Sequence, residues 1–204
     1  MSVILDACNK RFGEHRVQTI APKNDNEIEL LLIDLELRSP VKVLLTNGLS
    51  NYTMPVPEKL KNHNHCELLF CLPSYWELDS SDDKYQWPFE WIHKLANHLI
   101  YKETWYGHGH TFANGNPPKP FSSTMKQNHL LLCDPILLEE QFAPIELNDR
   151  NIDFLAIVPL FDDEFEYKGN KGSFKFLKKF RAKNYNEVLD DFRETCLKSR
   201  LRFY

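Results

Sequence analysis

Hydrophobic residues along the chain gather in short runs that polar turns and prolines separate. Five such runs predict β-strands, at 29–36, 41–46, 65–72, 129–133 and 153–159. Ser39-Pro40 marks a turn between the first two runs. The last run is apolar almost throughout, which is typical of a strand that is covered on both faces.

Other segments repeat their apolar residues at helical spacing. The first such segment lies within Val3–His15, and we expect its helix to end at Gly13, because glycine commonly ends helices. The second opens at Trp87-Pro88, with proline in its first turn, and continues to about Lys102. Two further helices are expected near the C-terminus, at 173–181 and 185–201.

The order of these elements indicates the fold class. Strands and helices interleave without a regular strand–helix–strand cadence, so a mixed β-sheet flanked by helices is favoured, an α/β protein of the α+β type. The 204 residues match the usual size of one domain. We therefore expect a single compact domain over 1–204, in which 173–204 form a C-terminal helical tail.

Composition and charge narrow the function classes only slightly. The chain is 42% hydrophobic and 26% charged, which is ordinary for a globular protein, and its net charge of −4 gives no reason to expect nucleic acid as a partner. No basic leader precedes an apolar segment, and no run approaches the ~20 apolar residues that span a bilayer. We expect a cytoplasmic protein with reduced cysteines and no membrane association.

The motifs of common enzyme families do not occur in the sequence. Neither a phosphate-binding glycine loop nor a Gly-x-Ser-x-Gly nucleophile motif is present. Cys66 and Cys71 lie in apolar runs, where cysteine behaves as a small hydrophobic residue. These motifs therefore offer no candidate catalytic residue, and we expect no cofactor.

Histidines provide one alternative to a binding protein. His108 and His110 are two residues apart, and so are His63 and His65, so each pair lies on one face of an extended segment. A zinc site needs ligands from both pairs, which requires the fold to bring the two segments together. A metal-dependent enzyme that uses these four histidines stays an open alternative.

Two clusters of charge provide further candidate surfaces. Asp162, Asp163 and Glu164 belong to an acidic cluster that suits a basic protein partner, because complementary charge speeds and orients association. The segment 171–183 is rich in lysine and contains no acidic residue. On a helix its lysines would face solvent, while Phe174, Leu177 and Phe180 would face the core; binding of nucleic acid by this helix is a second alternative.

A longer pattern extends over most of the chain. Its parts are Arg11-Phe-Gly13, Leu45-Thr-Asn-Gly-Leu-Ser50, Glu67-Leu-Leu-Phe-Cys-Leu-Pro73 with Trp76, Trp87-Pro88 with Leu95-Ala96, Thr104-Trp105 before Gly109-His110-Thr111, Leu130-Leu-Leu-Cys-Asp-Pro135, and Phe154-Leu-Ala-Ile-Val-Pro159 with Glu164. In this order they resemble the Suppressor of fused domain family, in particular its compact bacterial members. The resemblance covers residues from about 12 to about 172, and Leu49 stands where methionine is commoner in the family.

The resemblance implies a mixed α/β domain that binds protein and does not catalyse a reaction. Many bacterial members look like immunity proteins, so the implied partner is a toxin or effector domain that this chain neutralises. In animal relatives the loop that corresponds to 105–116 lies near the partner-binding face. We therefore expect partner contacts from the loop and from the acidic cluster, at Trp105, Tyr106, His108, His110, Asp162, Asp163 and Glu164.

Overall fold

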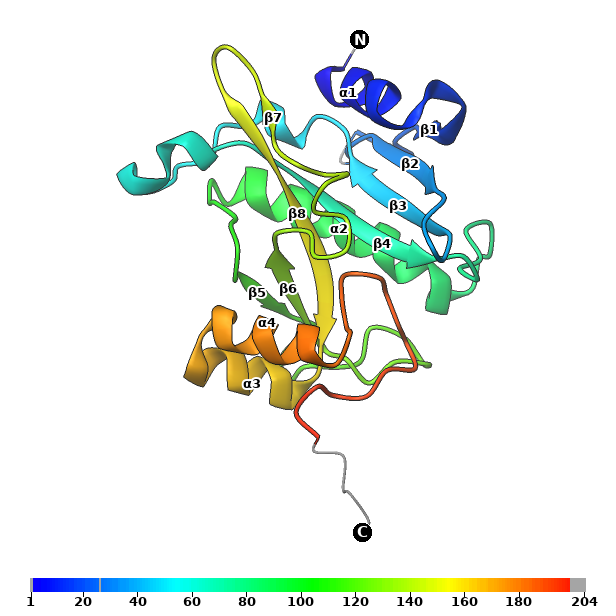
Figure 1. The fold of residues 1–204 in the computed structure, drawn as a ribbon, viewed down its shortest axis with the longest axis vertical. Helices are drawn as coiled ribbons and strands as arrows, with labels where there is room; N and C mark the ends of the chain where they lie inside the picture. Colours follow the sequence, from blue (N-terminus) through cyan, green and yellow to red (C-terminus); the bar gives the residue numbers. More distant parts are fainter. Residues whose placement is uncertain (1, 26, 199–204) are drawn as a thin grey trace.

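A computed structural model describes residues 2–25 and 27–198 of the chain. Its centre is an eight-stranded sheet in the order β1-β2-β3-β4-β8-β6-β5, with β7 paired to β8 off this path (Figure 1). The strands are β1 (Val17–Ile20), β2 (Leu30–Leu35), β3 (Val41–Thr46), β4 (Cys66–Pro73), β5 (Thr111–Ala113), β6 (His129–Cys133), β7 (Ile145–Glu146) and β8 (Asn151–Leu160). Only the β4–β8 pair is parallel among the strand pairs of the described residues, so the predicted mixed sheet is confirmed.

Helices cover both faces of the sheet, which explains why its central strands are almost entirely buried. The helices are α1 (Val3–Phe12), α2 (Asp83–Tyr101), α3 (Asp162–Lys171) and α4 (Ser173–Ala182). Neighbouring strand residues belong to opposite cores: Leu44 belongs to the core that includes α2, and Leu45 belongs to the core that includes α1 and α4. Figure 1 shows α2 behind the sheet and α3 with α4 beside β5 and β6.

α2 begins earlier than the sequence pattern predicts. The side chain of Asp82 accepts a hydrogen bond from the backbone N–H of Lys84 and so caps the helix before Asp83. Pro88 therefore lies inside the helix and not in its first turn, where it removes one main-chain hydrogen bond. The apolar stripe that follows, including Trp91, Ile92 and Leu95, is buried against the sheet.

The predicted helix at 185–201 is wrong over its described part, because residues 185–198 contain no helix. The side chains of Asn186 and Asp190 accept hydrogen bonds from backbone N–H groups two residues further on, which stabilises turns in place of helix. Val188 forms an isolated parallel bridge with Cys71 on β4, and the N–H of Leu189 donates to the Cys71 carbonyl. Residues 199–201 of the predicted helix lie outside the described residues.

α4 is present as predicted, but a different set of aromatic residues is buried. Phe176, Leu177 and Phe180 enter the core, whereas Phe174 is 81% exposed. The side chains at positions i, i+1 and i+4 share one helix face, and Phe174 falls on the opposite side.

The cysteines are buried side chains of the two cores, as the sequence predicts for those in apolar runs. Cys8, Cys66, Cys71, Cys133 and Cys196 are all buried and free. Burial raises the pKa of the Cys8 thiol to about 12 and raises the pKa of Cys66 and Cys71 as well. None of the helices among the described residues is both long and apolar enough to cross a membrane.

Candidate protein-interaction site

The loop from Thr104 to His110 connects α2 to β5, and the sheet fixes its course. The N–H of Gly109 donates to the Leu132 carbonyl at 2.7 Å, and the N–H of Leu132 donates to the His110 carbonyl at 2.8 Å. Gly109 has a φ of +94°, and a Cβ atom there would lie 2.6 Å from the hydroxyl oxygen of Ser173 on α4. Glycine is therefore required at 109 for the loop to pass this close to α4.

The predicted contact residues of this loop have different environments. Tyr106 is 2% exposed, and its hydroxyl donates to the Leu95 carbonyl at 3.0 Å, so it anchors the loop and is not available to a partner. Trp105 is half-buried, with its ring 4.4 Å from the ring of His110. His108 is exposed, and its Nδ1 lies 2.9 Å from a carboxylate oxygen of Asp134. The prediction for Tyr106 is thus corrected, while the other three residues lie at least partly at the surface.

Trp105 lines two hollows. One, the His110 hollow, has a volume of about 370 Å³ and includes His98, Trp105, His110, Phe112 and Lys168 in its lining. Burial, followed by the charge of Lys168, lowers the pKa of His110. The imidazole is therefore neutral at neutral pH and offers a hydrogen bond without charge.

The second hollow has a volume of about 460 Å³, and we call it the two-aspartate hollow. Its lining includes the apolar residues Met54, Cys66, Trp105 and Leu155 and the polar residues His63, His108, Asp134 and Asp153. Nδ1 of His63 lies 2.8 Å from a carboxylate oxygen of Asp153. The hydrogen bond from His108 and the nearby His63 lower the pKa of Asp134, so this carboxyl group is charged at neutral pH.

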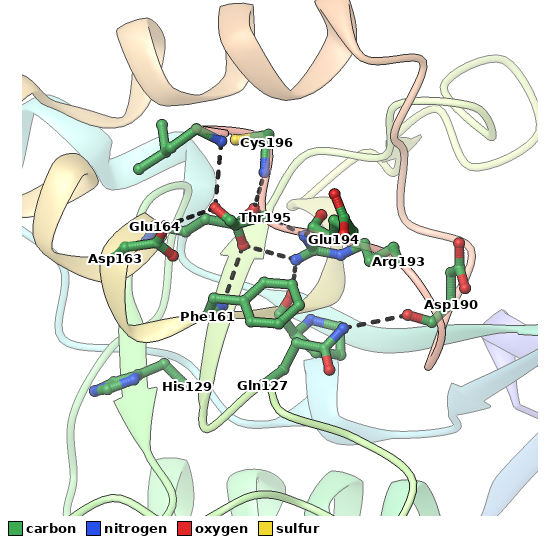
Figure 2. A network of polar contacts seen from close by, with 12 residues as sticks. Gln127, His129, Phe161, Asp163, Glu164, Asp190, Arg193, Glu194, Thr195 and Cys196 are labelled. Carbon is green, nitrogen blue, oxygen red and sulfur yellow. Dashed lines mark hydrogen bonds and ion pairs between the residues drawn. The ribbon is translucent and has the colours of Figure 1, made fainter. Parts of the chain in front are cut away.

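Most of the acidic cluster is used within the molecule. Glu164 is fully buried, and its carboxylate oxygens accept hydrogen bonds from the two Arg193 Nη atoms at 2.8 and 2.7 Å (Figure 2). The same carboxylate accepts the backbone N–H groups of Phe161 and Cys196. Glu164 is therefore a structural residue that holds the C-terminal segment to α3, and the expectation that it contacts a partner is corrected.

Its two neighbours also face the chain itself. A carboxylate oxygen of Asp163 accepts the Thr195 hydroxyl at 2.8 Å, and one of Asp162 accepts the side-chain amide of Asn128 at 3.3 Å. Both aspartates are exposed, so they remain accessible to a partner. All three acidic residues lie in the first turn of α3, where negative charge is favourable because of the helix dipole.

The four histidines of the metal-site alternative do not converge. His63 and His108 line the two-aspartate hollow together, but His110 lies in the other hollow. His65 is buried, with Nδ1 2.8 Å from the Ser50 carbonyl oxygen. Among residues 2–25 and 27–198, no group of three histidine, cysteine or acidic side chains is arranged to hold a metal ion.

The lysine-rich segment places its charge at the surface. Lys175, Lys178, Lys179 and Arg181 are exposed on α4, and Phe174 lies among them. Binding of nucleic acid by this face remains a prediction.

Asp134 and Asp153 were missed by the search for motifs, although strand order brings them together. Asp134 follows the end of β6, and Asp153 lies near the start of β8. Because β6 and β8 are antiparallel, the last residues of β6 lie beside the middle of β8, and the two aspartates are at the same end of these strands. The only signal in the sequence was a polar residue at the boundary of each apolar run.

Comparisons with known proteins identify relatives of this fold. The model of the Suppressor of fused protein (SUFU) family matches residues 24–194. A chain of the Sufu–Fu complex crystal structure superposes with a TM-score of 0.70 at 15% identity, covering 95% of this chain and 90% of the other.

Two further structures extend the comparison. A SUFU homologue from Neisseria gonorrhoeae superposes with a TM-score of 0.69 at 11% identity and covers 97% of this chain and 96% of its own. Drosophila Suppressor of Fused superposes with a TM-score of 0.67 at 15% identity; 95% of this chain matches, but only 50% of that protein. No curated protein sequence matches the chain.

Proposed function

The chain belongs to the Suppressor of fused family, and we propose that it acts in the cytoplasm by binding a protein partner without catalysing a reaction. Family membership is the observation that carries this proposal. A relative with the same fold has been crystallised in the Sufu–Fu complex, so the fold is compatible with a bound protein.

The surface proposed for this contact is the loop with its two hollows. Trp105 lines both hollows and packs against His110, and His108 of the same loop is exposed. Aromatic side chains next to concave surfaces are typical centres of protein interfaces. Asp162 and Asp163 would add negative charge from the exposed first turn of α3, the helix that also provides Lys168 to the His110 hollow.

The finer proposal is an immunity protein or a similar inhibitor that neutralises a toxin or effector domain. Such a protein needs a rigid surface that covers the active site of its partner, and a preformed surface limits the entropy lost on binding. The loop meets this requirement, because Gly109 and His110 are hydrogen-bonded to the sheet and Tyr106 is buried beneath them. The homologue from Neisseria gonorrhoeae has the same fold, so the fold is not confined to animal proteins.

The test begins with capture of the tagged, full-length protein from its native cells and identification of stoichiometric partners. The purified partner is then titrated with the protein, and we expect a one-to-one complex with a dissociation constant of about 1 nM or less. We expect Trp105→Ala to weaken this complex by at least about tenfold, because the side chain lines both hollows.

A matched control is Phe174→Ala, which removes an exposed aromatic side chain from α4. Equal weakening by both substitutions would show that the docking surface is not confined to the loop and extends onto α4. A partner domain that remains fully active in an excess of the protein would overturn the inhibitor proposal while leaving a protein-binding role.

A further inference from the structure

The two-aspartate hollow combines an apolar floor with negatively charged groups at its rim. Met54, Cys66 and Leu155 are each at most 3% exposed and form part of the floor. The side chains of Asp134 and Asp153 are 71% and 21% exposed, so their carboxylates lie nearer to solvent. None of the described residues that line this hollow is a lysine or an arginine.

Each carboxylate uses only part of its capacity to accept hydrogen bonds. The Oδ2 atoms of Asp134 and Asp153 contact His108 and His63. Among the described residues, neither Oδ1 atom has a hydrogen-bond donor. Two carboxylate oxygens therefore remain available to a donor that enters the hollow, and the histidines hold both side chains in place.

We propose that the two-aspartate hollow receives an arginine side chain of the protein partner. This inference rests on the proposed function and names the chemistry that the partner presents. The aliphatic part of the arginine would pack on Met54 and Leu155, while its planar guanidinium would reach the carboxylates and face the indole of Trp105.

Arginine fits this hollow better than the other charged side chains. Its fork of donors matches carboxylates, and it loses less hydration than lysine when it enters a partly apolar site. A volume of about 460 Å³ lies within the range of small-molecule sites and accommodates one long side chain with part of its backbone.

The test uses the full-length protein and the blocked peptide acetyl-Gly-Leu-Arg-Leu-Gly-amide. Otherwise identical peptides carry citrulline, lysine or glutamate in place of arginine; citrulline keeps the shape of arginine without its charge. Binding is followed by the NMR signals of the indole N–H groups. Trp105 lines the hollow, and Trp76, Trp87 and Trp91 do not, so they are internal controls.

We expect the arginine peptide to shift the Trp105 signal, with weaker binding of the lysine peptide and none of the other two. Asp134→Lys should weaken arginine binding by at least about tenfold, because it replaces an attractive charge with a repulsive one. Asp134 is largely exposed, so this variant should fold; unchanged signals of the other tryptophans would verify that it does. The control Asp79→Asn removes an exposed carboxylate elsewhere and should have no effect.

Two results would overturn the proposal. One is an equal shift of the Trp105 signal with the citrulline and arginine peptides. The other is no shift with the arginine peptide at about 10⁻² M, a concentration at which a weak single contact is detectable. Neither result affects the protein-binding role, which depends on the complex with the native partner. Conversely, the protein could bind the arginine peptide and yet capture no protein partner from its native cells. That result would contradict the proposed protein-binding function, while the preference of the hollow for arginine would stand.

Discussion

The acidic cluster of α3 and the two aspartates of the hollow use the same chemical group for different purposes. Glu164 is contiguous with Asp162 and Asp163 in sequence, yet its carboxylate is fully buried and paired with Arg193. Asp134 and Asp153 are distant in sequence but line one cavity. Neighbouring charges along a chain thus do not identify a binding surface, whereas charges that strand order brings together at a hollow can form one.

The environment of each carboxylate explains the difference. Arg193 also donates to the Pro159 carbonyl at 2.6 Å, and its guanidinium lies over the rings of Phe161, Phe180 and Tyr185 (Figure 2 shows the first of these rings). A buried pair in which both Nη atoms of the arginine donate hydrogen bonds stabilises one position of the segment. Asp134 is instead exposed to solvent, so it contributes little to stability and remains accessible.

The largest expected effect is that of Arg193→Ala on stability. This substitution leaves the buried carboxylate of Glu164 without its counter-charge, which costs about 3–5 kcal/mol of the free energy of unfolding. Equilibrium unfolding in urea measures the change. Lys198→Ala is the matched control, because it breaks the exposed pair with Glu194 and should cost less than about 1 kcal/mol. Similar losses in both variants would show that the buried pair has no special role.

A second substitution tests Glu187, a buried carboxylate that forms no ion pair with any lysine or arginine in the part of the chain that the structure describes. Glu187 is 1% exposed and accepts the backbone N–H groups of Ile136, Leu137 and Leu138. Glu187→Ala leaves these donors unsatisfied and should cost about 1–3 kcal/mol, less than the loss of Arg193. Urea unfolding under the same conditions gives the comparison.

Asp190→Ala is a control for Glu187→Ala because it removes only an exposed turn residue of the same segment. A larger loss at Asp190 than at Glu187 would contradict the expectation that the three backbone hydrogen bonds of Glu187 stabilise the fold more than the turn at Asp190 does.

The fold was largely predictable from the sequence, because strands that are covered on both faces appear as continuous apolar runs. The five predicted strands are present in the sheet. The short edge strands β1 and β5 were missed, since β1 has no fully buried residue and β5 has only three residues. α3 was missed as a helix because its first turn is acidic and Glu164 is its only buried residue.

The C-terminal segment and the site depend on contacts between distant residues. The apolar spacing after Tyr185 predicts a helix, but Asn186 and Asp190 form turns, and Leu189 bonds to Cys71 of β4. The loop was predicted over 105–116, but residues 111–113 form β5. The burial of Tyr106 depends on its contact with Leu95 in α2. Such contacts follow from tertiary packing and have no local signal.

The smallest expected effect concerns pH and the exposed carboxylate. The pKa of Asp134 is lowered in the folded protein, chiefly by the hydrogen bond with His108. The folded state therefore binds this proton less readily than the unfolded state, and the contribution to stability is present above the ordinary aspartate pKa and disappears as the pH falls through the folded value.

Because the side chain is 71% exposed, solvent screening limits this contribution to less than about 0.5 kcal/mol. His108→Ala removes the main cause, so it should raise the pKa of Asp134 toward its ordinary value, which NMR titration of the carboxyl carbon measures directly. The same titration in Arg193→Ala should leave Asp134 unchanged, because Arg193 is not among the groups that shift it. A shift of Asp134 in Arg193→Ala would mean that the two groups of carboxylates are coupled, and their separation into a structural network and an accessible site would fail.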